Sequence, residues 1–159
     1  MEQIVIKGQT KEEIYSELLP QIKSLIEDEP DLIANLANVS SALKQAFSSF
    51  SWVGFYLMKG DELVLGPFQG KLACTRIKVG SGVCGTAVLK KETIVVPDVE
   101  KFPGHIYCDP DSKSEIVVPL IKDGEVRGVL DIDSYELNNF DEVDKIYLEK
   151  LVNLLISKL

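Results

Sequence analysis

The first fifty residues carry apolar side chains at the spacing of amphipathic helices. From Thr10 onward these side chains are Ile14, Leu18, Ile22, Leu25 and Ile26. From about Asp31 a second set comprises Ile33, Leu36, Ala37, Leu43 and Phe47. Recurrence every three or four residues predicts two helices within residues 10–48. Pro20 interrupts the first of them and predicts a kink or two shorter helices.

Residues 51–134 show a different pattern, in which short apolar runs alternate with turn residues. Residues 52–58 predict a strand that presents Trp52 and Tyr56 on one face and Phe55 on the other. Further strands are expected at 63–65, 72–77, 94–96, 116–121 and 126–132. The last two form a hairpin around Asp123-Gly124, and a closing amphipathic helix is expected at about 141–157. This order of elements predicts a single α+β domain covering residues 1–159.

Two connections between these strands have unusual features. Three glycines surround Ser81, which is a candidate N-cap for a short helix over residues 82–89. Residues 97–114 form a long segment without apolar periodicity, and it contains Cys108 and the only histidine, His105. A structureless loop of this length in a compact domain is either disordered or functional. The cysteine and the histidine favour function.

The three cysteines are Cys74, Cys84 and Cys108. Cys84 falls in the first turn of the short helix, where the helix dipole favours a thiolate, so the residues alone make it the candidate nucleophile. The simpler alternative is that all three are inert packing thiols, because this number is ordinary for the length. A zinc site would also explain thiols near acids. The sequence has no Cys-x-x-Cys and no paired histidines, so no metal is expected.

Asp131 and Asp133 lie two positions apart on an apolar strand, so both point to one face. If this face is buried, the two carboxylates require a partner cation, a metal or a wet pocket. Alternatively, Asp133 begins a turn and Asp131 is exposed at an edge. Glu115 would face the opposite side if Asp123-Gly124 is a strict two-residue loop. Bringing the three acids together requires a one-residue irregularity, for which Pro119 and Gly128 are suitable positions, or a Glu115 outside the regular strand.

Charge and hydropathy narrow the class of protein. The 17 basic and 25 acidic side chains give a net charge of −8, and the basic ones are scattered, which disfavours nucleic acid and anionic membranes as partners. No apolar run is long enough to span a membrane, and no signal peptide is visible. An odd number of cysteines without an export signal indicates a reducing compartment, so a cytoplasmic protein is expected.

Several segments together resemble one known family, the free methionine-(R)-sulfoxide reductases, which are single GAF-domain enzymes. The resemblance covers nearly the whole chain and is carried by residues 52–56, 66–74, 82–86, 104–109, 114–117 and 129–134. It implies a six-stranded antiparallel sheet flanked by helices. The sheet and active-site loops would then occupy about residues 51–134. A GAF domain that only binds ligands would share the hydrophobic pattern but not this set of thiols.

The resemblance also implies roles for individual residues. Cys108 matches the nucleophile, Cys74 the main resolving cysteine, and Cys84 a further cysteine that can enter disulfide exchange. The pocket acids match Glu115, Asp131 and Asp133, of which Glu115 also counts as catalytic, and the pocket aromatics match Trp52 and Tyr56.

The implied reaction is the thiol-dependent reduction of free L-methionine (R)-sulfoxide, without a cofactor and with thioredoxin as the reductant. A homodimer is a further expectation. The alternative is a GAF-type module that binds a small molecule or senses redox state without turnover.

Overall fold

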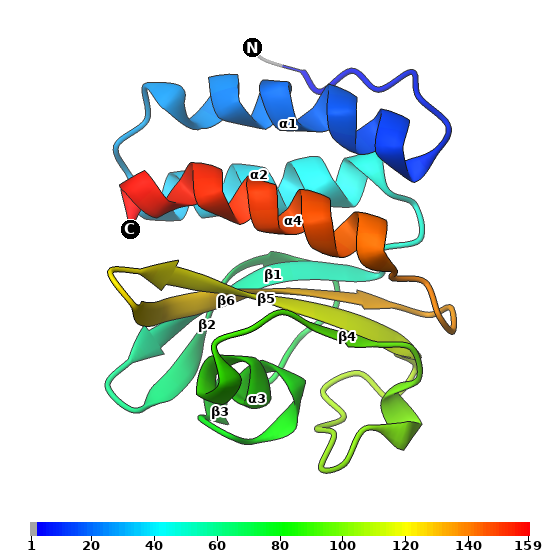
Figure 1. Ribbon diagram of the computed structural model, residues 1–159, viewed down its shortest axis with the longest axis vertical. Helices are drawn as coiled ribbons and strands as arrows, with labels where there is room; N and C mark the ends of the chain where they lie inside the picture. Colours follow the sequence, from blue (N-terminus) through cyan, green and yellow to red (C-terminus); the bar gives the residue numbers. More distant parts are fainter. Residues whose placement is uncertain (1–2) are drawn as a thin grey trace.

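The centre of the molecule is a six-stranded antiparallel sheet with the strand order β3-β2-β1-β6-β5-β4. The structure is a computed structural model and describes residues 3–159 (Figure 1). The strands are β1 (Trp52–Lys59), β2 (Glu62–Gln69), β3 (Arg76–Lys78), β4 (Ile94–Val96), β5 (Ser114–Lys122) and β6 (Glu125–Ser134). Strands β1 and β6 pair at the middle of the sheet, so their side chains are covered on both faces.

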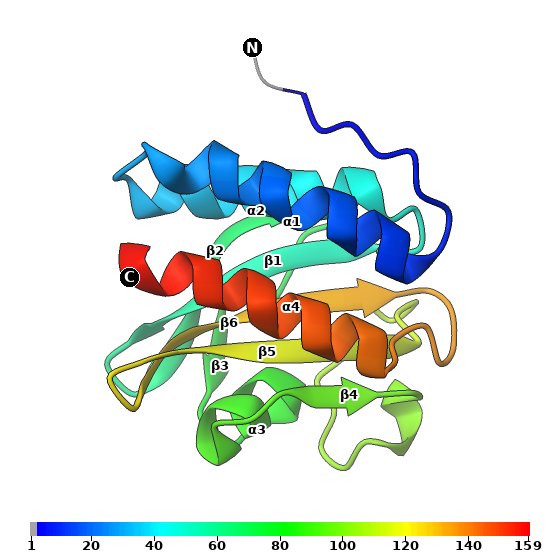
Figure 2. The same cartoon turned by 45° about the horizontal axis from the view of Figure 1, so that its top comes forward.

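The helices divide unequally between the two faces of the sheet. Figures 1 and 2 show α1 (Lys11–Glu27), α2 (Leu32–Ala46) and α4 (Glu142–Leu155) layered over one face. The short helix α3 (Gly82–Lys90) and the loop that follows β4 cover the other. The chain also forms the 3-10 turns Val99–Lys101 and Ile156–Lys158. Among residues 3–159, no helix is long and apolar enough to cross a membrane.

Side-chain caps fix where the three longer helices begin. Thr10 and Glu13 form a capping box at the start of α1, Asp31 accepts from the backbone of Ala34 in α2, and Asp141 caps α4. The alternative of two shorter helices at the N-terminus is wrong, because α1 continues through Pro20.

Some predicted helix faces and strand limits are also wrong. Ile33 is expected on the apolar face of the second helix but is 53% exposed. Strand β2 extends to Gln69, whereas the strand expected at 72–77 is reduced to β3 at Arg76–Lys78.

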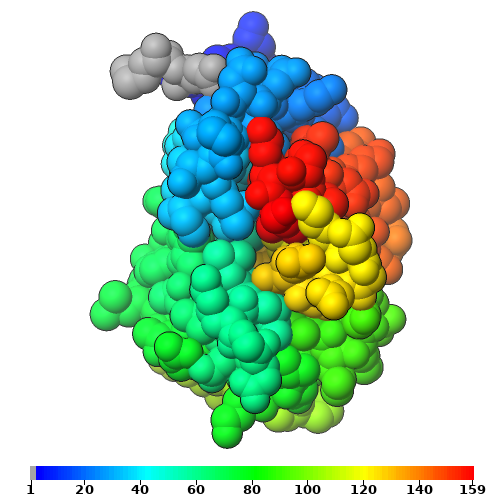
Figure 3. Space-filling view, turned by 90° about the vertical axis from the view of Figure 1, so that its left-hand side faces the viewer, coloured from blue at the N-terminus to red at the C-terminus, as the bar shows by residue number. Residues whose placement is uncertain are grey.

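The end of the chain is held against the rest of the helical layer. Lys158 Nζ donates to the carbonyl of Glu27 at 3.0 Å, and Lys122 Nζ donates to that of Leu159 at 2.6 Å. Figure 3 shows this end (red) between the α1–α2 connection (blue) and the β5–β6 hairpin (yellow). These contacts hold the end of α4 against the helical layer and β5, one of the two strands that carry the acids.

The β5–β6 pair contains the irregularity that the acids require. The hairpin turns through Asp123 and Gly124, both with positive φ, and the register shifts between Leu120 and Ile121. The shift lies next to Gly128, where an added Cβ would come within 2.4 Å of the Tyr56 carbonyl. It places Glu115 directly opposite Asp133. The expectation of a one-residue irregularity is therefore confirmed, and all three acids share one face.

Two hydrophobic clusters lie on opposite faces of the sheet. The larger one joins α1, α2 and α4 to inward residues such as Phe55, Ile116 and Leu130. The smaller one lies under α3 and includes Trp52, Tyr56 and Cys84. The predicted alternation along β1 is therefore confirmed. The smaller cluster forms the floor of the candidate site.

Candidate active site

An open pocket of about 540 Å³, including the solvent at its mouth, lies on the α3 face of the sheet. Strands β1, β5 and β6 form its floor, and α3 and the 97–113 loop form its walls. Seven of the eight predicted site residues line it: Trp52, Tyr56, Cys84, Cys108, Glu115, Asp131 and Asp133. Cys74, the eighth, is joined to the pocket through a disulfide bond.

The disulfide links Cys74 to Cys108, whose Cα atoms are 5.4 Å apart. This separation is within the ordinary range for a disulfide. Cys74 lies between β2 and β3, and Cys108 lies in the long loop before β5. The bond therefore joins two loops at the pocket, and the structure represents the oxidised form of this pair.

Cys84 does not have the environment expected of a nucleophile. Its thiol is buried, and within the described chain it forms no disulfide. Burial raises the pKa of the Cys84 thiol well above its usual value, and the neighbouring Asp131 and Glu115 raise it further. A helix N-terminus stabilises an anion by about 0.3–2 kcal/mol, which is less than the usual cost of burying a charge beside other anions. The expectation of a Cys84 thiolate is wrong for this reason.

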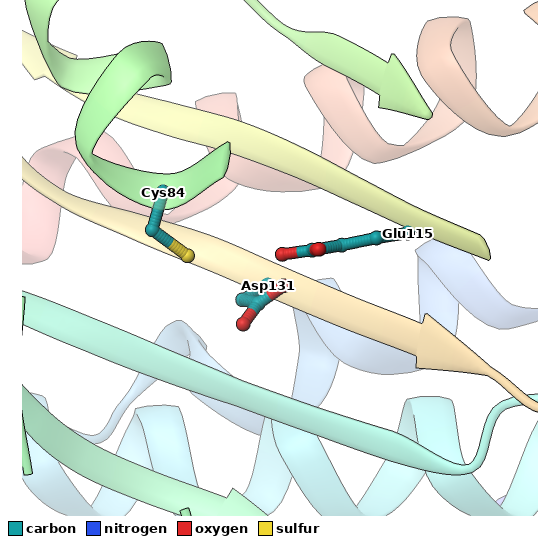
Figure 4. Close-up of side chains that lie close together, drawn as sticks. All are labelled: Cys84, Glu115 and Asp131. Atoms are coloured by element: carbon teal, nitrogen blue, oxygen red, sulfur yellow. The ribbon is translucent and has the colours of Figure 1, made fainter. Parts of the chain in front are cut away.

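Glu115 and Asp131 are buried on the central strands and Asp133 is half-buried at the pocket, and Figure 4 shows Glu115 and Asp131 pointing toward the Cys84 thiol. Burial raises the pKa of Asp131 to about 6, although Glu115 and Cys84 act to lower it. Burial also raises the pKa values of Glu115 and Asp133 well above their usual range, and the charge on Asp131 adds to both shifts. The alternative of an edge-exposed Asp131 is wrong, because Asp131 is 6% exposed on a central strand.

The pocket does not contain a basic side chain that could neutralise these acids. Among the described residues that line it, none is a lysine or an arginine. His105 Nδ1 lies 3.8 Å from Glu115 Oε2, but burial lowers the pKa of His105 and disfavours its charged form. Within residues 3–159, Asp131 Oδ1 has no hydrogen-bond partner. The pocket is therefore suited to a ligand that brings its own positive charge.

Two aromatic side chains of β1 shape the floor of the pocket. The indole of Trp52 lies against Gly54 and stacks on Phe68 with ring centroids 5.3 Å apart. A Cβ at Gly54 would come within 2.4 Å of the indole, so glycine is required for this arrangement. Tyr56 Oη donates to the carbonyl of Cys74 at 2.9 Å. Tyr56 thus holds the loop that carries Cys74.

A second group of residues, which the sequence did not indicate, joins the two cysteine-bearing loops. Tyr135 Oη donates to Asp109 Oδ2 at 2.7 Å, and Lys71 Nζ lies 5.3 Å from the Tyr135 ring centroid and 3.4 Å from Asp111 Oδ2. Asp109 directly follows Cys108, and Lys71 precedes Cys74 by three residues. The only available signal was this proximity in sequence to the cysteines. His105 was likewise noted in its loop but not assigned to the pocket.

Comparison with known proteins agrees with this fold and site. Residues 27–156 match the GAF domain family. The chain is 58% identical to GAF domain-containing protein A of Dictyostelium discoideum, over 97% of this chain and 98% of the relative. It is 50% identical to the free methionine-R-sulfoxide reductase of Saccharomyces cerevisiae, over 91% of this chain and 85% of the relative. The chain also superposes on the crystal structure of free methionine-R-sulfoxide reductase from Neisseria meningitidis in complex with its substrate. The TM-score is 0.97 at 52% identity, and the match covers 99% of this chain and 95% of that one.

The sheet order, the flanking helices and the family match define a GAF domain. Within that class, the chain belongs to the family of free methionine-R-sulfoxide reductases.

Replacing a buried acid should change how stability depends on pH. The folded-state pKa of Asp131 is raised from 3.8 to about 6, so the folded protein binds more protons than the unfolded chain across this window. Stability therefore falls as pH rises from about 4 to 6. Asp131→Asn should flatten this decline and raise the free energy of unfolding near neutral pH by on the order of 2 kcal/mol.

The measurement is urea unfolding of the disulfide form at several pH values, with Asp123→Asn as the matched control. Asp123 is exposed at the turn of the same hairpin, so this control should reproduce the parent curve. Equal stability of Asp131→Asn and the parent protein at every pH would contradict the assignment of a raised pKa.

Proposed function

We propose that this protein reduces free L-methionine (R)-sulfoxide to methionine. The observation that carries the proposal is the Cys74–Cys108 disulfide beside a pocket of buried acids that lacks a basic side chain among the described residues. A disulfide is the product expected when a sulfenic acid meets a second thiol. The names of the yeast and Neisseria relatives support the same substrate.

In the proposed cycle the reduced Cys108 thiolate attacks the sulfoxide sulfur while the sulfoxide oxygen takes up a proton. The oxygen is transferred to the Cys108 sulfur as the S–O bond of the sulfoxide breaks; methionine leaves, and Cys108 becomes a sulfenic acid, a two-electron oxidation of the thiol. The Cys74 thiol then displaces water from this sulfenic acid and forms the disulfide. A dithiol reductant of the thioredoxin type supplies two electrons to reopen it.

The acids would oppose ionisation of Cys108 if all of them were charged. One carboxylate about 6 Å away costs a thiolate roughly 3 kcal/mol at an effective dielectric constant near 20. The ammonium group of a free amino acid would offset this charge, and the raised pKa of Glu115 keeps a proton available for the departing oxygen. Asp131 and Asp133 would then bind the amine. A peptide-bound methionine sulfoxide has no such group, which explains a restriction to the free amino acid.

The remaining assignments follow from position. Trp52 and Tyr56 would enclose the methyl-sulfur end of the substrate. Cys84 is deeper in the pocket and would act as a secondary partner in disulfide exchange. A cytoplasmic location and thioredoxin as reductant fit the chemistry of this cycle, and a homodimer remains an expectation. The alternative, a binding or redox-sensing GAF module, would form the disulfide without turning over substrate.

The decisive assay uses racemic methionine sulfoxide with dithiothreitol, followed by chiral amino-acid analysis. The R-sulfoxide should disappear over many turnovers while the S-sulfoxide remains, and the N-acetylated R-sulfoxide should react at least about 100-fold more slowly because it has no ammonium group. Fewer than one equivalent of methionine per chain would support the sensing module instead. Equal rates for the acetylated substrate would contradict the role of the acids.

Single-turnover experiments on the reduced cysteine variants separate the roles of the thiols. Cys108→Ser should release no methionine, because no other sulfur attacks the substrate. Cys74→Ser should release about one equivalent per chain in the burst, but its multiple turnover with thioredoxin should fall sharply. A full burst from Cys108→Ser together with its loss in Cys84→Ser would reverse the assignment.

A further inference from the structure

The buried end of the pocket gathers ligand atoms of two chemical kinds. One sulfur and two carboxylates come from three elements: Cys84 from α3, Glu115 from β5 and Asp131 from β6. Their ligand atoms all lie within 4.8 Å of one another, and all three residues are buried. Figure 4 shows them directed toward a common centre. Carboxylates alone would suit calcium or magnesium, whereas the thiol selects a softer ion.

One oxygen of this cluster and one nitrogen beside it lack hydrogen-bond partners within residues 3–159. Asp131 Oδ1 is buried without a hydrogen bond, in a residue that is only 6% exposed. His105 Nδ1 is also buried without one, with its side chain 6% exposed and 3.8 Å from Glu115 Oε2. Buried polar atoms without partners are costly; the first of these belongs to the ligand cluster and the second lies beside it. A neutral histidine is itself a common metal ligand.

We propose that Cys84, Glu115 and Asp131 bind one Zn²⁺ ion, with His105 as the nearest additional ligand. Zinc binds thiolate at about 2.3 Å and carboxylate at about 2.0–2.2 Å in tetrahedral sites, so the three side chains need to close in by roughly 1 Å. The ion would occupy the place where the substrate's ammonium group is expected. Zn²⁺ therefore competes with the amino acid and inhibits turnover; this competition rests on the proposed function, whereas the binding of the ion does not.

The disulfide form of the protein provides a clean test of the ion's binding. The chain has three cysteines and two are in the disulfide, so a thiol count of one confirms that Cys84 alone is available. The protein is titrated with Zn²⁺ in a calorimeter and, in parallel, by the fluorescence of Trp52, the only tryptophan, which lines the pocket. A parallel titration with Co²⁺ reports thiolate coordination through its near-ultraviolet charge-transfer absorption.

One Zn²⁺ per chain is expected, and Cys84→Ser and Asp131→Asn should each weaken binding by at least about tenfold, since even outer partners of zinc ligands cost that much. Glu125→Gln, an exposed acid at the far end of β6, is the matched control and should bind as the parent does. The near-isosteric Asp131→Asn keeps the test valid if Cys84→Ser does not fold. Equal affinity in the parent and Asp131→Asn, or the absence of saturable binding, overturns the proposal.

The competition is tested separately with methionine. Saturating free methionine should weaken the Zn²⁺ affinity of the parent protein, and unchanged affinity would overturn the overlap of the two sites. Reductase activity is measured with a chelator present. Turnover without Zn²⁺ binding would overturn the zinc site and support the proposed function. Zn²⁺ binding without turnover would support the zinc site and overturn the proposed function.

Discussion

The main constraint on the structure is the enclosure of three carboxyl groups, two of them buried, on strands β5 and β6. Glu115 and Asp131 are buried and Asp133 is half-buried on strands covered on both faces, where a charged group without a partner is strongly disfavoured. The residues that line the pocket, as the structure describes them, offer no lysine or arginine in compensation. Burial therefore raises the pKa values of all three acids, that of Asp131 to about 6. The same cost makes the pocket selective for cationic ligands.

The two faces of the sheet separate stability from function. Residues that point toward α1, α2 and α4 are apolar and form the larger cluster, while those that point toward α3 combine aromatic, thiol and carboxyl groups. A single register shift beside Gly128 decides on which face Glu115 lies. One residue of irregularity in a hairpin thus determines whether the acid joins the pocket. Helix α4, whose position is fixed by Asp141 and by contacts at the chain end, covers β5 from the side away from the pocket.

Much of this arrangement could be predicted from the sequence, because periodicity reports directly which side chains share a face. Alternation along residues 52–58 placed Trp52 and Tyr56 together, and the two-residue spacing placed Asp131 beside Asp133. The need for a hairpin irregularity followed from counting residues around Asp123-Gly124. Periodicity contains no information on contacts between loops, so the Tyr135–Asp109 hydrogen bond and the position of His105 were not foreseen.

The cysteines show the limit of local sequence rules. A helix N-terminus lowers the pKa of a thiol, but burial among acids outweighs this effect at Cys84. The sequence around Cys84 does not reveal Asp131 and Glu115, which come from strands more than thirty residues away. Conversely, the loop that carries Cys108 has no secondary-structure signal. Its partner Cys74 was indicated only by resemblance to a family, whereas the structure brings the two together across the pocket.

Asp131 is expected to give up its proton when a ligand's ammonium group enters the pocket. Calorimetric titration of the reduced protein with free methionine near pH 6, close to the pKa of Asp131, tests it when repeated in buffers of different ionisation enthalpy. A cation beside the acids lowers their pKa values, so binding should release protons to the buffer, and the release should decrease in Asp131→Asn. Methionine binding without proton release, or with proton uptake, would contradict the account.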